Sequence, residues 1–249
     1  MNSPFSLQGK TVLVTGASSG LGRHTALTCA RMGASVIVTG RDVLRLQETY
    51  DQLSGDGHIQ VQADLTQAAD REHLVQASKS INGLVHCAGK QKLCPIRQLS
   101  ESDMTDIYNV NFLAPLMLTQ RLLQANVIAT QGSIVFLLSI AAHIGTRGVG
   151  PYSAMKSGLI GIIKCLALEQ AKRKIRVNGI SPSAVETPMW RGGHADELKA
   201  APLLDAQKAK HPLGLGTMDD VANAVVYMLS DASRWVTGTS LVLDGGVVL

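Results

Sequence analysis

Short apolar runs alternate with longer amphipathic stretches along almost the whole chain of 249 residues. Runs of aliphatic and β-branched residues are typical of buried strands, and apolar positions that recur every three or four residues indicate helices. The predicted strands are 11–14, 35–39, 58–63, 83–87, 133–138, 176–180 and 240–243. The predicted helices are 21–32, 42–53, 66–79, 100–124, 152–171 and 218–229, and Pro115 divides 100–124 into two.

This alternation predicts a doubly wound (Rossmann) α/β fold: a mostly parallel seven-stranded sheet with helices on both faces. No linker or low-complexity segment interrupts the pattern, so we expect a single domain over 1–249. Such sheets bind ligands at the carboxyl ends of their strands. Candidate residues follow the predicted strands at these ends: Gly16, Arg41, Asp64, Ala88, Ser139 and Pro182. Their common edge indicates a ligand site more strongly than any one of them.

A glycine-rich turn, Thr15 to Gly22, follows the first predicted strand and opens the first helix. Gly16, Gly20 and Gly22 are spaced Gly-x-x-x-Gly-x-Gly. Glycines permit positive φ and close backbone approach, and a helix N-terminus offers N–H groups to a pyrophosphate. The alternative is a turn without a ligand, but the strand before it and the helix after it favour a dinucleotide.

The end of the second strand distinguishes between cofactors, because an acidic residue there pairs with a ribose 2′-hydroxyl and a basic one with a 2′-phosphate. Gly40 has no side chain, and Arg41 can pair with a phosphate. The alternatives are that Arg41 is an ordinary surface residue and that Asp42 caps the next helix. We expect NADP(H), with NAD(H) second. Asp64 is a candidate acceptor for the adenine amino group or, alternatively, a cap for the helix at Thr66.

Tyr152 and Lys156 lie four residues apart in a predicted helix and therefore share a face. At ~4 Å and an effective dielectric constant of about 20, an ammonium stabilises a phenolate by about 4 kcal/mol, which predicts that the pKa of Tyr152 falls towards neutrality. Tyr152 would then exchange a proton with a carbonyl or alcohol oxygen, which Ser139 could hold. Hydride would move to or from a nicotinamide.

With these motifs, the chain from about Leu7 to Val247 resembles the short-chain dehydrogenase/reductase family. Asn111, Ser139, Tyr152 and Lys156 match the family's catalytic residues. The resemblance implies that Lys156 also bonds the nicotinamide ribose, that Asn111 holds a proton-relaying water, and that Val185 and Thr187 contact the nicotinamide amide. The full predicted cofactor set is Gly16, Ser18, Ser19, Gly20, Leu21, Gly22, Arg41, Asp64, Leu65, Ala88, Gly89, Tyr152, Lys156, Pro182, Val185 and Thr187.

Two positions depart from the family pattern. Cys87-Ala88-Gly89 stands where the family has Asn-Ala-Gly, so Cys87 replaces the asparagine. We interpret Cys87 as a small buried residue, and the absence of the asparagine's hydrogen bonds puts local rigidity in doubt. Ser183 replaces the usual glycine after Pro182 and could narrow the space beside the nicotinamide. The resemblance also implies a homodimer or homotetramer, formed through helices at 111–124 and 152–171.

The segment 188–212 interrupts the alternation and is predicted to cover the substrate. Within it, Arg191 or His194 could recognise an anionic group or be ordinary loop charges, and His143 could line the pocket or be structural. We expect an NADP(H)-dependent interconversion of a ketone and a secondary alcohol, with a 3-oxoacyl thioester as the first substrate candidate. The alternatives are a sugar, polyol or polycyclic alcohol dehydrogenase, and a non-catalytic nucleotide-binding scaffold or redox sensor.

Charge, cysteine spacing and the length of apolar runs argue against several other classes of protein. The net charge is only +4, and the one basic cluster, Lys172 to Lys174, lies at a predicted helix end, so nucleic acid is not expected. The four cysteines lack paired spacing, which favours a reducing compartment and argues against disulfides or a metal site. The start lacks signal-peptide features, and the longest apolar run, 134–144, is too short to cross a bilayer. We therefore expect a cytoplasmic enzyme that binds no membrane.

Overall fold

The computed structural model describes residues 3–185, 187 and 205–248. Within them, seven strands form one parallel sheet in the order β3-β2-β1-β4-β5-β6-β7. The strands are β1 Thr11–Thr15, β2 Ser35–Gly40, β3 Ile59–Gln62, β4 Ile81–His86, β5 Ile128–Leu137, β6 Arg176–Pro182 and β7 Ser240–Leu243. The predicted doubly wound parallel sheet is thereby confirmed.

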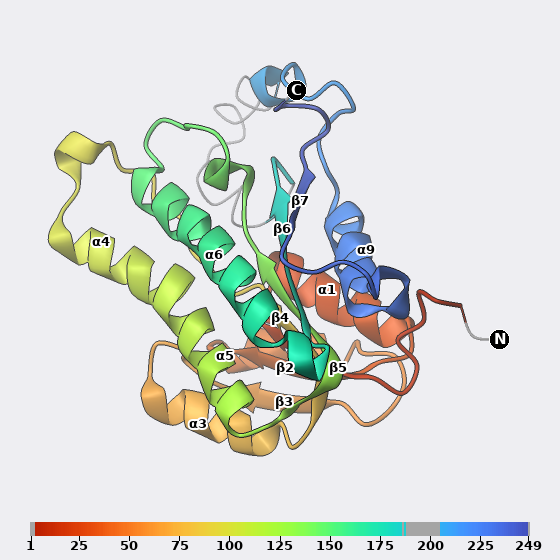
Figure 1. Ribbon diagram of the computed structural model, residues 1–249. Helices are drawn as coiled ribbons and strands as arrows, with labels where there is room; N and C mark the ends of the chain where they lie inside the picture. Colours follow the sequence, from red (N-terminus) through yellow and green to blue (C-terminus); the bar gives the residue numbers. More distant parts are fainter. Residues whose placement is uncertain (1–2, 186, 188–204, 249) are drawn as a thin grey trace.

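Helices cover both faces of the sheet (Figure 1). Their bounds are α1 Gly20–Arg31, α2 Val43–Tyr50, α3 Ala68–Ala77, α4 Glu101–Tyr108, α5 Ala114–Gln124, α6 Gly150–Glu169 and α9 Met218–Leu229. One apolar core joins the sheet to α3, α5 and α6, and the other joins it to α1, α2 and α9. None of the described helices combines the length and apolarity needed to span a bilayer.

The predicted break within 100–124 is present as a π-helical turn, η2, at Asn109–Leu113 between α4 and α5. Pro115 lies in the first turn of α5, directly after the π-helical turn, and its missing N–H removes one bond from the helical ladder at this point. Strand β5 begins at Ile128, earlier than the predicted 133. The polar residues before 133 resemble a turn in sequence, but Gln131 adopts a φ of 65° and the strand continues through this irregularity.

A buried arginine on β6 closes the C-terminal end of α9. Arg176 donates hydrogen bonds to the carbonyl oxygens of Met228 (2.7 Å) and Ser230 (3.2 Å) and to the hydroxyl of Ser233 (2.7 Å). The last carbonyls of a helix have no partner within it, so this side chain satisfies groups that would otherwise be buried without a hydrogen bond. It ties the last helix of the fold to β6, the strand next to the edge strand β7.

Replacing Arg176 by methionine is expected to lower the free energy of unfolding by roughly 3 kcal/mol, because buried carbonyl groups lose charged donors. Urea denaturation monitored by circular dichroism measures the change. The control is Lys10→Met, which removes a lysine whose ion pair with Asp231 (2.7 Å) lies at the surface and should shift stability by no more than about 1 kcal/mol. Equal effects of the two variants would contradict this role of Arg176.

Candidate active site

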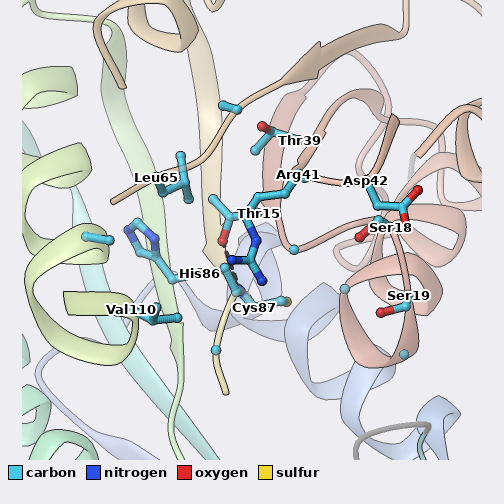
Figure 2. A pocket seen from close by; sticks show the side chains of 18 of the residues that line it. Thr15, Ser18, Ser19, Thr39, Arg41, Asp42, Leu65, His86, Cys87 and Val110 are labelled. Atoms are coloured by element: carbon cyan, nitrogen blue, oxygen red, sulfur yellow. Dashed lines mark hydrogen bonds between the residues drawn. The ribbon is translucent and has the colours of Figure 1, made fainter. Parts of the chain in front are cut away.

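A cavity of about 580 Å³ lies at the carboxyl ends of β1, β2, β3 and β4 (Figure 2). Among its lining residues are all the cofactor contacts predicted after these strands: Gly16, Ser18, Ser19, Gly20, Leu21, Gly22, Arg41, Asp64, Leu65, Ala88 and Gly89. The structure therefore brings together residues that are spread over more than seventy positions of the chain (89 − 16 = 73). The residues that follow these four strands thus lie together at one edge of the sheet, as predicted.

Glycines at the turn between β1 and α1 allow very close backbone contacts. Gly16 has a φ of 66°, and a Cβ atom there would lie 2.8 Å from the backbone of Ala88. A Cβ atom on Gly22 would lie 2.1 Å from the carbonyl oxygen of Gly16. The side chain of Ser19, the N-cap of α1, makes no capping hydrogen bond, so it does not occupy the first N–H groups of the helix. This cradle fits an anionic pyrophosphate.

The end of β2 offers the basic side chain of Arg41 and leaves little room for a side chain at position 40. A Cβ atom on Gly40 would lie 3.1 Å from the Oγ atom of Ser18, so a larger residue would press on that hydroxyl. The side chain of Arg41 extends into the cavity (Figure 2). Asp42 caps α2, as the alternative interpretation held: its carboxylate accepts from the N–H of Arg45 (3.0 Å) and pairs with that residue's guanidinium (2.7 Å). These bonds, the backbone one first, lower the pKa of Asp42.

Asp64 is similarly engaged in a local turn. Its Oδ1 atom accepts hydrogen bonds from the backbone N–H (3.0 Å) and hydroxyl (2.7 Å) of Thr66. The helix itself begins later than predicted, at Ala68, with Gln67 as its N-cap. Asp64 thus stabilises the turn before α3 and does not cap the helix, so the predicted cap is wrong; it does line the cavity, where it stays a candidate acceptor for an adenine amino group.

A second cavity of about 150 Å³ adjoins the first at the carboxyl ends of β5 and β6 and shares Leu21, Cys87, Gly89 and Thr187 with it. Its lining includes the predicted residues Ser139, Tyr152, Lys156, Pro182, Val185 and Thr187. Ser139 lies two residues after the end of β5, where its hydroxyl accepts from the N–H of Ala141 (3.2 Å) and caps a short 3-10 turn. The residues predicted to transfer a proton therefore lie beside the cavity predicted to hold the cofactor.

Lys156 is 5% exposed, and its Nζ atom donates to the carbonyl oxygen of Leu137 at 2.6 Å. It lies 5.6 Å from the ring centroid of Tyr152. Burial lowers the pKa of Lys156 to about 8. Burial also raises the pKa of Tyr152, with a hydrogen bond to Ser139 acting in the opposite direction.

The predicted fall in the Tyr152 pKa is therefore wrong for this structure. Removal of the phenol from water outweighs the lysine, whose ammonium bonds a backbone carbonyl and faces the ring. At neutral pH Tyr152 is consequently a phenol that carries its proton. This is the form that a proton donor needs.

Asn111 lies in the π-helical turn and is 1% exposed. Its Nδ2 atom donates to the carbonyl oxygens of Lys90 (2.9 Å) and Ile107 (3.1 Å), and its Oδ1 atom accepts from the N–H of Lys90 (3.1 Å). The side chain is not among the residues that line either cavity. It holds the loop after β4 and reaches the back of Gly89, where a Cβ atom would lie 2.9 Å from Oδ1.

The loss of the family's asparagine at Cys87 leaves its backbone well held. The Oγ1 atom of Thr15 accepts from the N–H groups of Cys87 and Ala88, both at 3.1 Å. Burial raises the pKa of the Cys87 thiol to about 12, so the residue stays a thiol at neutral pH. A small structural residue, as interpreted from sequence, agrees with this environment.

Several cavity-lining residues have no motif in the sequence, and the buried His86 is one of them. Its imidazole is stacked on Phe136 with ring centroids 4.7 Å apart, and its Nε2 atom lies 2.8 Å from the Oγ1 atom of Thr119. Burial lowers the pKa of His86 to about 3, so the ring is neutral. Figure 2 shows it between Leu65 and Val110. It lies at the end of the buried strand β4, where no local motif distinguishes it from core residues.

Arg191 and His194 lie outside the described residues, as does most of the predicted substrate cover. Of that cover, 205–208 is helical. His143 is not among the cavity-lining residues; its Nε2 atom lies 2.9 Å from the Oγ atom of Ser181, which in turn lies 2.8 Å from the Oγ atom of Ser240. This contact favours the structural interpretation of His143.

Comparison with known proteins agrees with this geometry. A family model described as enoyl-(acyl carrier protein) reductase matches residues 16–248. The chain is 35% identical to (2S)-[(R)-hydroxy(phenyl)methyl]succinyl-CoA dehydrogenase subunit BbsD of Thauera aromatica, covering 96% of this chain and 97% of the relative. The chain belongs to the short-chain dehydrogenase/reductase family. Members of this family are oxidoreductases that bind NAD(P).

Two further relatives of this chain are named for different substrates. The 3-oxoacyl-[acyl-carrier-protein] reductase FabG of Thermotoga maritima is 33% identical and is matched over 98% of this chain and 99% of its own length. A solved structure from Beutenbergia cavernae, described as an NAD(P)-dependent gluconate 5-dehydrogenase with NADP bound at low occupancy, is 31% identical with a TM-score of 0.86 and 99% coverage of both chains. Family membership thus leaves several substrate classes open.

Proposed function

We propose that the protein is an NADP(H)-dependent oxidoreductase that interconverts a ketone and a secondary alcohol, with a 3-oxoacyl thioester as its first substrate candidate. The observation that carries the proposal is the small cavity in which Ser139, Tyr152 and Lys156 meet beside the larger cofactor groove. The similarity to FabG and to the acyl-CoA dehydrogenase subunit supports a thioester. The gluconate 5-dehydrogenase relative supports the second candidate, a sugar or polyol.

The groove would hold the dinucleotide through the N-terminus of α1 and the side chain of Arg41, and the bound cofactor supplies or accepts the hydride. Val185 and Thr187 are proposed to orient its nicotinamide end, as is Lys156 through the ribose. None of these contacts requires a change in the turn at Gly16, whose backbone already packs against Ala88. Pre-formed packing of this kind favours rapid binding without local folding.

In the proposed reduction, Tyr152 gives its phenolic proton to the carbonyl oxygen of the substrate while the hydroxyl of Ser139 holds that oxygen. The raised pKa of Tyr152 keeps this proton in place until the oxygen gains charge. The ammonium of Lys156 then stabilises the phenolate, because a dry site strengthens the attraction between the two charges. Asn111 is proposed to hold the loop at Gly89 and a water that returns protons to Tyr152.

Titration with NADPH and NADH, followed by a panel of 3-oxoacyl thioesters, ketoses and other ketones, tests this function. We expect NADPH oxidation with at least one carbonyl class. A protein that binds NADPH but reduces nothing in the panel would favour the non-catalytic scaffold or redox sensor instead. The homodimer or homotetramer and the cytoplasmic location stay predictions.

The cofactor preference gives a separate prediction at Arg41. Arg41→Ala should weaken NADPH binding by about 10- to 100-fold, since a charge-assisted pair with a phosphate is lost, and should leave NADH binding within about twofold. Quenching of protein fluorescence measures both dissociation constants. The control is Arg31→Ala at the opposite end of α1, where the guanidinium bonds Thr28 (2.8 Å). Equal weakening for both cofactors would contradict recognition of the 2′-phosphate.

A further inference from the structure

A chain of two hydrogen bonds connects the substrate cavity to the segment after residue 204. The Nδ1 atom of His211 lies 2.6 Å from the carbonyl oxygen of Gln207, and its Nε2 atom lies 2.9 Å from the Oγ atom of Ser183. His211 is 5% exposed. The backbone of Ser183 is also held, because its N–H donates to the carbonyl oxygen of Leu243 at 2.9 Å.

In a neutral imidazole, these contacts determine the direction of each hydrogen bond. A carbonyl oxygen only accepts, so Nδ1 of His211 must carry the proton that bonds Gln207. In the neutral imidazole Nε2 is then an acceptor, and the hydroxyl of Ser183 donates to it. With its only proton engaged, the Oγ atom of Ser183 can act towards any further partner only as an acceptor.

Ser183 lines the same cavity as Ser139 and Tyr152. Those two hydroxyls are the proposed partners of the reacting oxygen, whereas Ser183 replaces a family glycine and has no part in that chemistry. A ligand that shields this half-buried acceptor from water gains most when it brings an O–H or N–H group, and a ligand without one leaves the acceptor unpaired. The cavity therefore contains a polar group with a preset preference for donors.

We propose that Ser183, held as an acceptor by His211 and the carbonyl of Gln207, is a specificity-determining residue that selects substrates with an O–H or N–H donor near the reacting carbonyl. The inference rests on the proposed carbonyl reduction and deepens it. The donor can come from two sources: a hydroxyl group beside the ketone, as in sugars and polyols, or the amide N–H of the pantetheine-like arm of a thioester. Both present the same chemistry to Ser183.

Matched substrate pairs test the proposal at pH 8, where an imidazole is ordinarily neutral. The hydroxyketone pair is 3-hydroxy-2-butanone and 2-butanone. The thioester pair is acetoacetyl N-acetylcysteamine, which has the amide N–H, and S-ethyl acetothioacetate, which lacks it. For Ser183→Ala we expect kcat/KM to fall about five- to tenfold for the donor-bearing member of one pair and to stay within about twofold for its partner. The pair that responds identifies the source of the donor.

A second variant separates this role from packing. His211→Asn leaves the serine in place but removes its fixed acceptor state, so the donor preference should shrink by about two- to fivefold. The matched control is His143→Asn, which breaks the other serine-histidine contact on β6, to Ser181, a residue that is not among those lining the cavity. The control should leave the ratio of kcat/KM values within each pair unchanged. NADPH dissociation constants of all variants verify folding.

Three outcomes overturn the inference. In the first, Ser183→Ala lowers kcat/KM equally for both members of each pair. In the second, its effect is on NADPH affinity, which would assign Ser183 to the cofactor. In the third, the unmodified protein binds NADPH yet reduces neither pair nor the wider panel, and the proposed function then fails together with the inference. The first two leave carbonyl reduction intact, so the two failures are distinguishable.

Discussion

Replacing Tyr152 by phenylalanine should lower kcat for ketone reduction by about three orders of magnitude while leaving the NADPH dissociation constant within about twofold. A positioned proton donor contributes roughly 10²- to 10⁴-fold to rate, and this variant removes only the hydroxyl. The ring, which packs 5.6 Å from the Nζ atom of Lys156, is kept. Steady-state NADPH oxidation with the best carbonyl substrate measures the rate, and fluorescence titration measures the affinity.

The control for this variant is Tyr50→Phe. The Tyr50 hydroxyl lies 3.4 Å from the carbonyl oxygen of His58, and Tyr50 is absent from the lining of both cavities. Its loss should change kcat by less than about twofold. If Tyr152→Phe retained more than about a tenth of the activity, another group would have to supply the proton, and the proposed role of Tyr152 would be wrong.

The sequence predicted the sheet and the gathering of Gly16, Arg41 and Asp64 in one cavity, because both follow from short-range patterns. A strand that must be buried shows an apolar run, and the residue after it lies at the ligand-binding edge whatever its neighbours are. Gly16, Arg41 and Asp64 could therefore be assigned to one groove before their distances were known. Pro115 also indicated the break near Asn111, although not its π-helical form.

The pKa values of buried groups and the contacts between residues distant in sequence could not be predicted in this way. The pKa of Tyr152 depends on how much water the folded cavity excludes, and spacing along a helix carries no information about that. The same holds for His86, whose partner Thr119 is 33 residues away, and for the contact of Ser183 with His211, 28 residues away. Such pairs arise from the packing of elements and have no local motif.

The second large effect is expected at Lys156, where a substitution should raise stability while it lowers activity. Burial lowers the pKa of Lys156 from 10.5 to about 8. Below pH 8 the residue is protonated in both the folded and the unfolded chain, so folding must remove a charge from water. Between about pH 8 and 10.5 only the unfolded chain keeps this proton, and stability therefore rises with pH across that window. The full change is about 3 kcal/mol, at 1.36 kcal/mol for each pKa unit.

Lys156→Met is thus expected to lower kcat by about a hundredfold or more, because a phenolate at Tyr152 loses its counter-charge. At pH 7 the same variant should unfold with a free energy about 1–2 kcal/mol higher than the unmodified protein, part of the gain being offset by the lost hydrogen bond to Leu137. At pH 10 most of this advantage should disappear. Urea denaturation at both pH values measures the difference, in which other titrating groups cancel. If the variant were less stable than the unmodified protein at both pH values, Lys156 would instead stabilise the fold. The expected result means that the fold tolerates a destabilising buried charge because proton transfer requires it.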